Sequence, residues 1–270
     1  MAGKMTKLNN RGQITIFVIV AILLVSAIIL IFILYQNQIE ITERSEKDSE
    51  GEFSDCINSY VSEAVESIFE NAGFIEKPAL TYLVRNPKNY YFQDEVKEIP
   101  YLCYTGLNYA RCNPINPLMI NYLEDEIKQY IEPKVEICFE SLKRELQDKA
   151  YNIRLGNTES FDIEIKDGFI EINIIKKLTR EKAGEEEIFE QFSSKFNTNL
   201  YKIAKVSEEI ISQEIALCNS DYLSIMEGNN RINIKKFQTG DNVKIYTVKD
   251  MVTKKEWKFA IRNCVLSTPS

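Results

Sequence analysis

The chain has 270 residues, and it carries 33 basic and 40 acidic side chains. Only Lys4, Lys7 and Arg11 of the basic residues precede an apolar run near the N-terminus, and every acidic residue follows it, so the rest of the surface is acidic and disfavours nucleic acid as a partner. The chain contains no histidine, which excludes Ser-His-Asp and Cys-His catalysis and histidine metal sites. We therefore expect a protein that is not an enzyme and needs neither a cofactor nor a metal.

The apolar run extends over Ile14–Tyr35 and contains no charged residue. A helix of this length spans about 33 Å, which matches the hydrocarbon core of a bilayer. The basic residues before it and the mainly acidic segment after it predict a cytoplasmic N-terminus and a main domain outside the cytoplasm. The sequence thus predicts a single-pass protein of the cell membrane, held by this segment.

The segment that precedes the apolar run reads Asn10-Arg11-Gly12-Gln13-Ile14-Thr15-Ile16-Phe17. It resembles the class III signal peptide of archaeal type IV pilins and related pilin-like proteins. The resemblance implies that a prepilin-type peptidase cleaves between Gly12 and Gln13. It also implies that the mature chain assembles through its apolar helix with other copies or other pilin-like subunits. Many pilins carry glutamate where this chain has Phe17, which puts that assembly contact in doubt.

A second hypothesis retains an uncleaved signal anchor. In that case the chain is a surface binding or adhesion protein whose ligand the sequence does not define. Both hypotheses share one organisation: a basic leader over residues 1–12, an apolar helix over 13–36, a solvated stalk over 37–52 and an α+β domain over 53–270.

The first half of the domain alternates between helical and irregular segments. Apolar residues at helical spacing predict a helix over 53–72 and another over 118–149, which Pro133 should kink or split. The segment over 75–117 between them shows no clear periodicity, and we expect it to be irregular.

The second half begins with a predicted hairpin, because residues 161–165 and 170–174 alternate between apolar and charged side chains around Asp167-Gly168. Phe189, Phe192 and Phe196 open a predicted helix over 186–217. Alternation returns over 232–237, 243–247 and 257–261. The predicted fold class is therefore α+β, with an N-terminal transmembrane helix, then about three helices packed on an antiparallel sheet of about five strands.

The six cysteines all follow the apolar run, and none forms a CxxC pair. We expect three disulfides formed in an oxidising environment, and six buried thiols are the alternative. Proximity favours Cys103–Cys112. We further expect Cys56–Cys138 between two helices, and Cys218–Cys264 between the third helix and the last strand, although six cysteines allow many other connectivities.

The irregular segment is rich in tyrosine, and a Cys103–Cys112 disulfide would close part of it into a loop. Tyrosine combines an apolar ring with a polar tip, so such a loop can bind a partner. The alternative is a loop that packs on its own tyrosines. The candidate contact residues are Tyr90, Tyr91, Tyr101, Tyr104 and Tyr109.

Two runs of adjacent carboxylates remain, Glu124-Asp125-Glu126 and Glu185-Glu186-Glu187. Adjacent side chains on a helix point in different directions, so we expect solvated helical faces and not a catalytic or metal site.

Overall fold

A computed structural model describes residues 24–26, 28, 51–85 and 96–264. The chain divides into two compact units, residues 1–51 and residues 52–270. Most of the first unit lies outside the described residues, including the predicted leader, cleavage site and nearly all of the predicted stalk.

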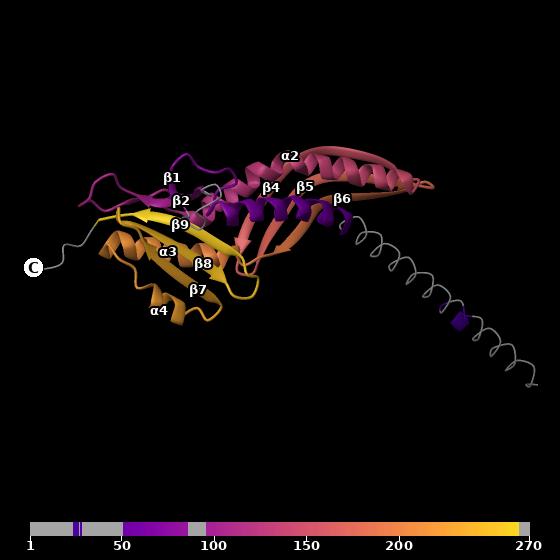
Figure 1. The fold of residues 1–270 in the computed structure, drawn as a ribbon. Coiled ribbons are helices and arrows are strands. Elements are labelled where there is room, and N and C mark those ends of the chain that lie inside the picture. Colours follow the sequence, from indigo (N-terminus) through magenta and orange to yellow (C-terminus); the bar gives the residue numbers. More distant parts are fainter. Residues whose placement is uncertain (1–23, 27, 29–50, 86–95, 265–270) are drawn as a thin grey trace, which may run out of the picture. The chain divides into compact units, whose positions relative to one another are not determined.

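Two helices cover one side of a long sheet (Figure 1). The first runs over residues 51–70, and the second is α2 (Met119–Asp148), which continues through Pro133 as one helix where we expected a kink or a break. Both are amphipathic. The disulfide Cys56–Cys138 joins them.

The long sheet is an antiparallel meander in the order β4-β5-β6, formed by β4 (Asn152–Lys166), β5 (Phe169–Lys182) and β6 (Glu185–Asn197). The hairpin predicted around Asp167-Gly168 is present, with Lys166 opposite Phe169 and a positive φ of 91° at Gly168. Phe192 of β6 packs with Phe53 and Phe139, so the sheet and both helices meet in one aromatic cluster.

A second sheet has the order β1-β2-β9-β8-β7, with the short β3 paired to β2. Its strands are β1 (Thr81–Arg85), β2 (Val96–Tyr104), β3 (Asn113–Pro114), β7 (Ile232–Gln238), β8 (Val243–Asp250) and β9 (Glu256–Arg262). The β2–β9 pair is parallel and every other pair is antiparallel. Helix α3 (Leu200–Leu217) contacts β8, and the short α4 (Tyr222–Glu227) contacts β7.

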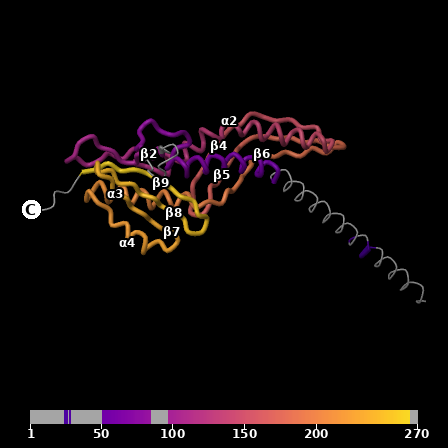
Figure 2. The backbone as a smooth tube through the Cα atoms, in the orientation of Figure 1, coloured from indigo at the N-terminus to yellow at the C-terminus, as the bar shows by residue number. Residues whose placement is uncertain are grey.

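The two sheets share one hydrophobic core, which runs from Phe53 through the β4-β5-β6 meander to Trp257 and Phe259 of β9. The backbone tube in Figure 2 shows the β4-β5-β6 sheet with α2 at one end of this unit and the second sheet with α3 and α4 at the other. A smaller apolar cluster, which includes Tyr101 and Ile245, lies on the opposite face of the second sheet.

The predicted fold class is wrong in two respects. The first concerns the membrane helix, because no helix among the described residues is long and apolar enough to cross a membrane. Only residues 24–26 and 28 of the predicted span belong to the described residues. The long helices α2 and α3 each turn a charged face outward. This finding overturns the predicted single-pass membrane location with its cytoplasmic N-terminus and outer domain.

The second correction concerns the sheets, since the described residues form nine strands in two sheets and not one sheet of about five. Residues 75–117, expected to be irregular, contain β1, β2 and β3. The predicted helix over 186–217 is β6 followed by α3. The pairing of β5 with β6 shifts in register between Ile175 and Leu178. As a result, the inward-facing residues Phe189 and Phe192 of β6 are three residues apart instead of two, which is the spacing expected of a helix.

The described cysteines form three disulfides, Cys56–Cys138, Cys103–Cys112 and Cys218–Cys264, which are the pairs expected from the sequence. They fix three different kinds of connection: helix to helix, the two ends of one loop, and the residue after α3 to the second residue after β9.

Replacing Cys56 and Cys138 together by alanine should lower the free energy of unfolding by about 4.5 kcal/mol, because this disulfide closes a loop with a sequence separation of 82. The same change at Cys103 and Cys112, with a separation of 9, should cost about 2.5 kcal/mol. Equilibrium unfolding in urea measures both values. Equal losses from the two pairs would contradict the loop-length argument.

Candidate functional site

The loop over residues 105–111 projects from the end of β2, and the Cys103–Cys112 disulfide closes it at the base. Its tip carries two large exposed side chains, Leu107 (69% exposed) and Tyr109 (89% exposed). We call residues 103–112 the closed loop. An exposed tyrosine and an exposed leucine on a short, covalently closed loop are available for contact with other molecules.

Hydrogen bonds fix the closed loop on both sides of the disulfide. The backbone N–H of Thr105 donates to the carbonyl oxygen of Arg262 at 3.0 Å, and that of Leu107 donates to the Thr105 hydroxyl at 3.2 Å. On the other side, the backbone N–H of Cys112 donates to Oδ1 of the buried Asn263 at 2.7 Å. The loop is therefore attached to the last residue of β9, Arg262, and to Asn263, the residue that follows it.

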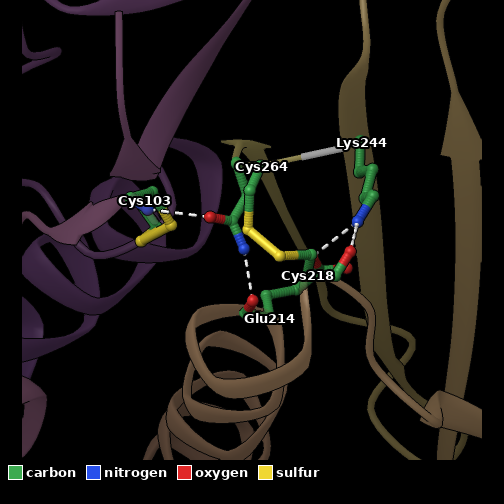
Figure 3. Close-up of a disulfide and its surroundings, with 7 residues drawn as sticks. Cys103, Glu214, Cys218, Lys244 and Cys264 are labelled. Carbon is green, nitrogen blue, oxygen red and sulfur yellow. Dashed lines mark hydrogen bonds and ion pairs between the residues drawn. A yellow bond between two sulfur atoms is a disulfide. The ribbon is translucent and has the colours of Figure 1, made fainter. Parts of the chain in front are cut away.

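Asn263 links the closed loop to α3, because its Nδ2 donates to the backbone carbonyl oxygen of Glu214 (Figure 3). The Glu214 side chain is fully buried. Its Oε2 accepts from Nζ of Lys244 at 2.6 Å, and its Oε1 accepts from the hydroxyl of Tyr246. Nζ of Lys244 also donates to the carbonyl oxygen of Cys218, which forms the disulfide with Cys264.

A second lysine, Lys236 of β7, completes this group, which we call the Glu214 cluster: Glu214, Lys236, Lys244 and Tyr246. Nζ of Lys236 lies 3.8 Å from Oε1 of Glu214, and its side chain is 14% exposed. Burial lowers the pKa of Lys236, and the Glu214 carboxylate opposes that effect. Burial also raises the pKa of Tyr246, as does the adjacent Glu214 charge, so this hydroxyl stays protonated and can donate.

The Glu214 cluster connects four parts of the chain: α3, the two neighbouring strands β7 and β8, and the segment after α3. A buried carboxylate is stable only when it is paired and hydrogen-bonded, and here the two lysines and the tyrosine meet that requirement. Asn263 connects the cluster to the closed loop, because it bonds both to the backbone of Glu214 and to the backbone of Cys112. Within the described part of the chain, no group of three or more cysteine, aspartate or glutamate side chains is arranged to hold a metal ion.

The structure separates the five candidate tyrosines. Tyr90 and Tyr91 lie outside the described residues. Tyr101 is buried in β2, between Tyr82 at 6.3 Å and Tyr104 at 5.1 Å between ring centroids, and burial raises its pKa to about 12. Tyr104 also accepts a hydrogen bond from Arg262. Of the described candidates, only Tyr109 is presented at the surface.

Three residues of this site, Leu107, Asn263 and Glu214, were not predicted from the sequence. Leu107 follows Gly106 inside the disulfide-closed segment, which was an available signal. Asn263 directly precedes Cys264, but nothing in the sequence indicates that its amide joins a loop to a helix. Glu214 lies on the apolar face of α3, among buried residues such as Ile210 and Ile211, and a charge at such a position is a signal of a buried partner.

The other residues singled out from the sequence have different outcomes. Arg11, Gly12 and Gln13 lie outside the described residues. Glu124 and Glu126 are not merely solvated, because they accept hydrogen bonds from the backbone N–H groups of Ile165 and Ile75 at 2.8 Å and 3.1 Å. The carboxylates at 185–187 lie in β6 and not on a helix.

Comparison with known proteins adds no identity: no protein-family model, no curated protein and no solved structure matches the chain.

Replacing Glu214 by glutamine should lower the free energy of unfolding by about 3 to 4 kcal/mol, because the buried Lys244 and the half-buried Lys236 then lose their counter-charge. The exposed Glu209, one turn earlier on α3, provides the control, and Glu209→Gln should stay within about 0.5 kcal/mol of the unmodified protein. Urea unfolding of both variants measures the difference. A loss below about 1 kcal/mol for Glu214→Gln would show that the cluster does not stabilise this end of the fold.

Proposed function

We propose that this chain is a non-enzymatic protein that works by contact, and that the closed loop is its contact element. The observation that carries the proposal is the exposure of Leu107 and Tyr109 on a loop whose two ends are fixed by a disulfide and by β9. A rigid loop loses little conformational entropy when it binds, so its exposed apolar side chains contribute more of their burial energy to affinity. The three disulfides support action in an oxidising environment, where such bonds persist.

A second candidate function rests on the sequence around the N-terminus. The resemblance of Arg11-Gly12-Gln13 and the apolar residues after it to a class III signal peptide supports a pilin-like subunit. In this proposal a prepilin-type peptidase removes residues 1–12, and the subunits associate with other copies or with other pilin-like proteins. The two proposals are compatible, because a subunit of an assembly can also present a contact loop.

Photo-crosslinking in the producing cells tests the contact proposal. A photoreactive phenylalanine derivative replaces Tyr109 in the full-length chain, and we expect irradiation to give a discrete adduct of higher mass. The same derivative at Ile188, an exposed apolar residue of β6, is the control and should give none. The absence of an adduct from position 109, or equal adducts from both positions, would contradict a contact function of the loop.

The second candidate predicts the N-terminus of the mature chain. Mass spectrometry of protein isolated from the producing cells should find Gln13 as the first residue, and Gly12→Val should abolish that product, because a branched side chain then replaces the hydrogen of glycine next to the scissile bond. Gly3→Val is the control and should leave processing unchanged. A mature chain that retains residues 1–12 would exclude pilin-type processing and leave the contact proposal intact.

A further inference from the structure

A reactive pair of side chains lies beside the Glu214 cluster. Nζ of Lys236, on β7, donates a hydrogen bond to Oδ1 of Asn219, in the short segment between α3 and α4. The amine and the amide carbonyl therefore already touch. Glu214, five residues before Asn219, lies next to the same amine, with Oε1 at 3.8 Å from Nζ. A lysine, an asparagine and a buried carboxylate are the three groups that amide transfer between side chains requires.

Burial and the neighbouring Lys244 charge lower the pKa of Lys236 and so make the loss of its proton easier, while the Glu214 carboxylate opposes that effect. The Lys236 side chain is largely buried, with 14% of it exposed. Lys244 already forms the closer ion pair with Glu214, at 2.6 Å, so two cationic side chains face one carboxylate in a poorly solvated place. Loss of one of these charges relieves an uncompensated buried ion.

Asn219 is positioned by the residue before it. Cys218 has a left-handed backbone, with φ of 54°, and it is held by the disulfide to Cys264 and by the hydrogen bond from Lys244 to its carbonyl oxygen. Asn219 itself is exposed, so its amide lies at the rim of the cluster, and a small leaving group can escape into solvent.

We propose that Lys236 and Asn219 form an intramolecular isopeptide bond, with Glu214 as the proton carrier. The Nζ–Cγ bond forms and the Cγ–Nδ2 bond of Asn219 breaks. Lys236 enters as its ammonium ion and gives up two protons, the first of which Glu214 passes to Nδ2. The leaving nitrogen takes both protons and departs as ammonium, so no oxidant or other reactant is needed.

The product is a covalent crosslink that reducing agents do not break. The neighbouring Cys218–Cys264 disulfide, in contrast, is broken by them. The crosslink joins the segment after α3 to β7, the edge strand of the second sheet, which pairs only with β8 among the described strands. An edge strand fixed in this way cannot slip in register or peel from the sheet. This inference is independent of what the closed loop contacts.

Peptide mapping of the full-length protein after reduction and alkylation tests the proposal. We expect one tryptic species in which the peptides containing Asn219 and Lys236 are joined, lighter than their sum by one ammonia, about 17 Da. The joined species is the decisive readout, because cyclisation of Gln13 at a processed N-terminus also releases ammonia. Trypsin should also fail to cleave after Lys236, since the modified side chain is no longer cationic.

Three variants make the test specific. Lys236→Arg keeps the charge but cannot form the bond, and Asn219→Ala removes the reacting carbonyl carbon by changing only an exposed side chain, so both should lose the joined species. Lys235→Arg changes the exposed neighbour on the same strand and should keep it. Circular dichroism verifies that each variant folds. Separate, unmodified peptides from the unaltered protein, or a joined species that persists in Asn219→Ala, would overturn the proposal.

Discussion

The buried carboxylate of Glu214 is the constraint on which this end of the molecule depends. A buried charge must be compensated by its neighbours. Here Lys236 and Lys244 supply positive charge and Tyr246 donates a hydrogen bond, and all three lie on the adjacent strands β7 and β8. The requirement fixes the rotation of α3 on the sheet, because any other face of the helix would leave the charge unpaired. The backbone carbonyl of the same residue holds Asn263, and Asn263 holds the closed loop.

Apolar packing has the corresponding role at the other end of the core. Phe53, Phe139 and Phe192 bring the first helix, α2 and β6 into contact, and the Cys56–Cys138 disulfide lies on the same pair of helices. Within the described residues, these two helices cover one face of the long meander. Continuity of the core between this region and the second sheet makes the fold one unit and not two small domains.

The elements that were predictable from sequence have strong local signals. The hairpin around Asp167-Gly168 shows strict alternation and a turn residue with positive φ, and the helix over 51–70 shows an unbroken apolar stripe. Local patterns failed where a distant partner decides the structure. The register shift between β5 and β6 gave β6 the apolar spacing of a helix, so this strand was predicted as helical. The strand β2 was not predicted, because its parallel partner β9 lies far along the chain. In the candidate site, composition identified the tyrosine-rich segment, but burial in the sheet decided that Tyr101 packs inside while Tyr109 is presented.

The parallel pairing of β2 with β9 has a consequence for the order of folding. Tyr101 of β2 lies opposite Ala260 of β9. The second edge of β2 can therefore be paired only after nearly all of the remaining chain has been made. The β4-β5-β6 meander has only local connections and can form while the second sheet is still incomplete. During synthesis β2 therefore keeps an unpaired edge until β9 has been made. In that interval, a chaperone that binds extended segments, or a partner that pairs one of its own strands with β2, can bind the unpaired edge.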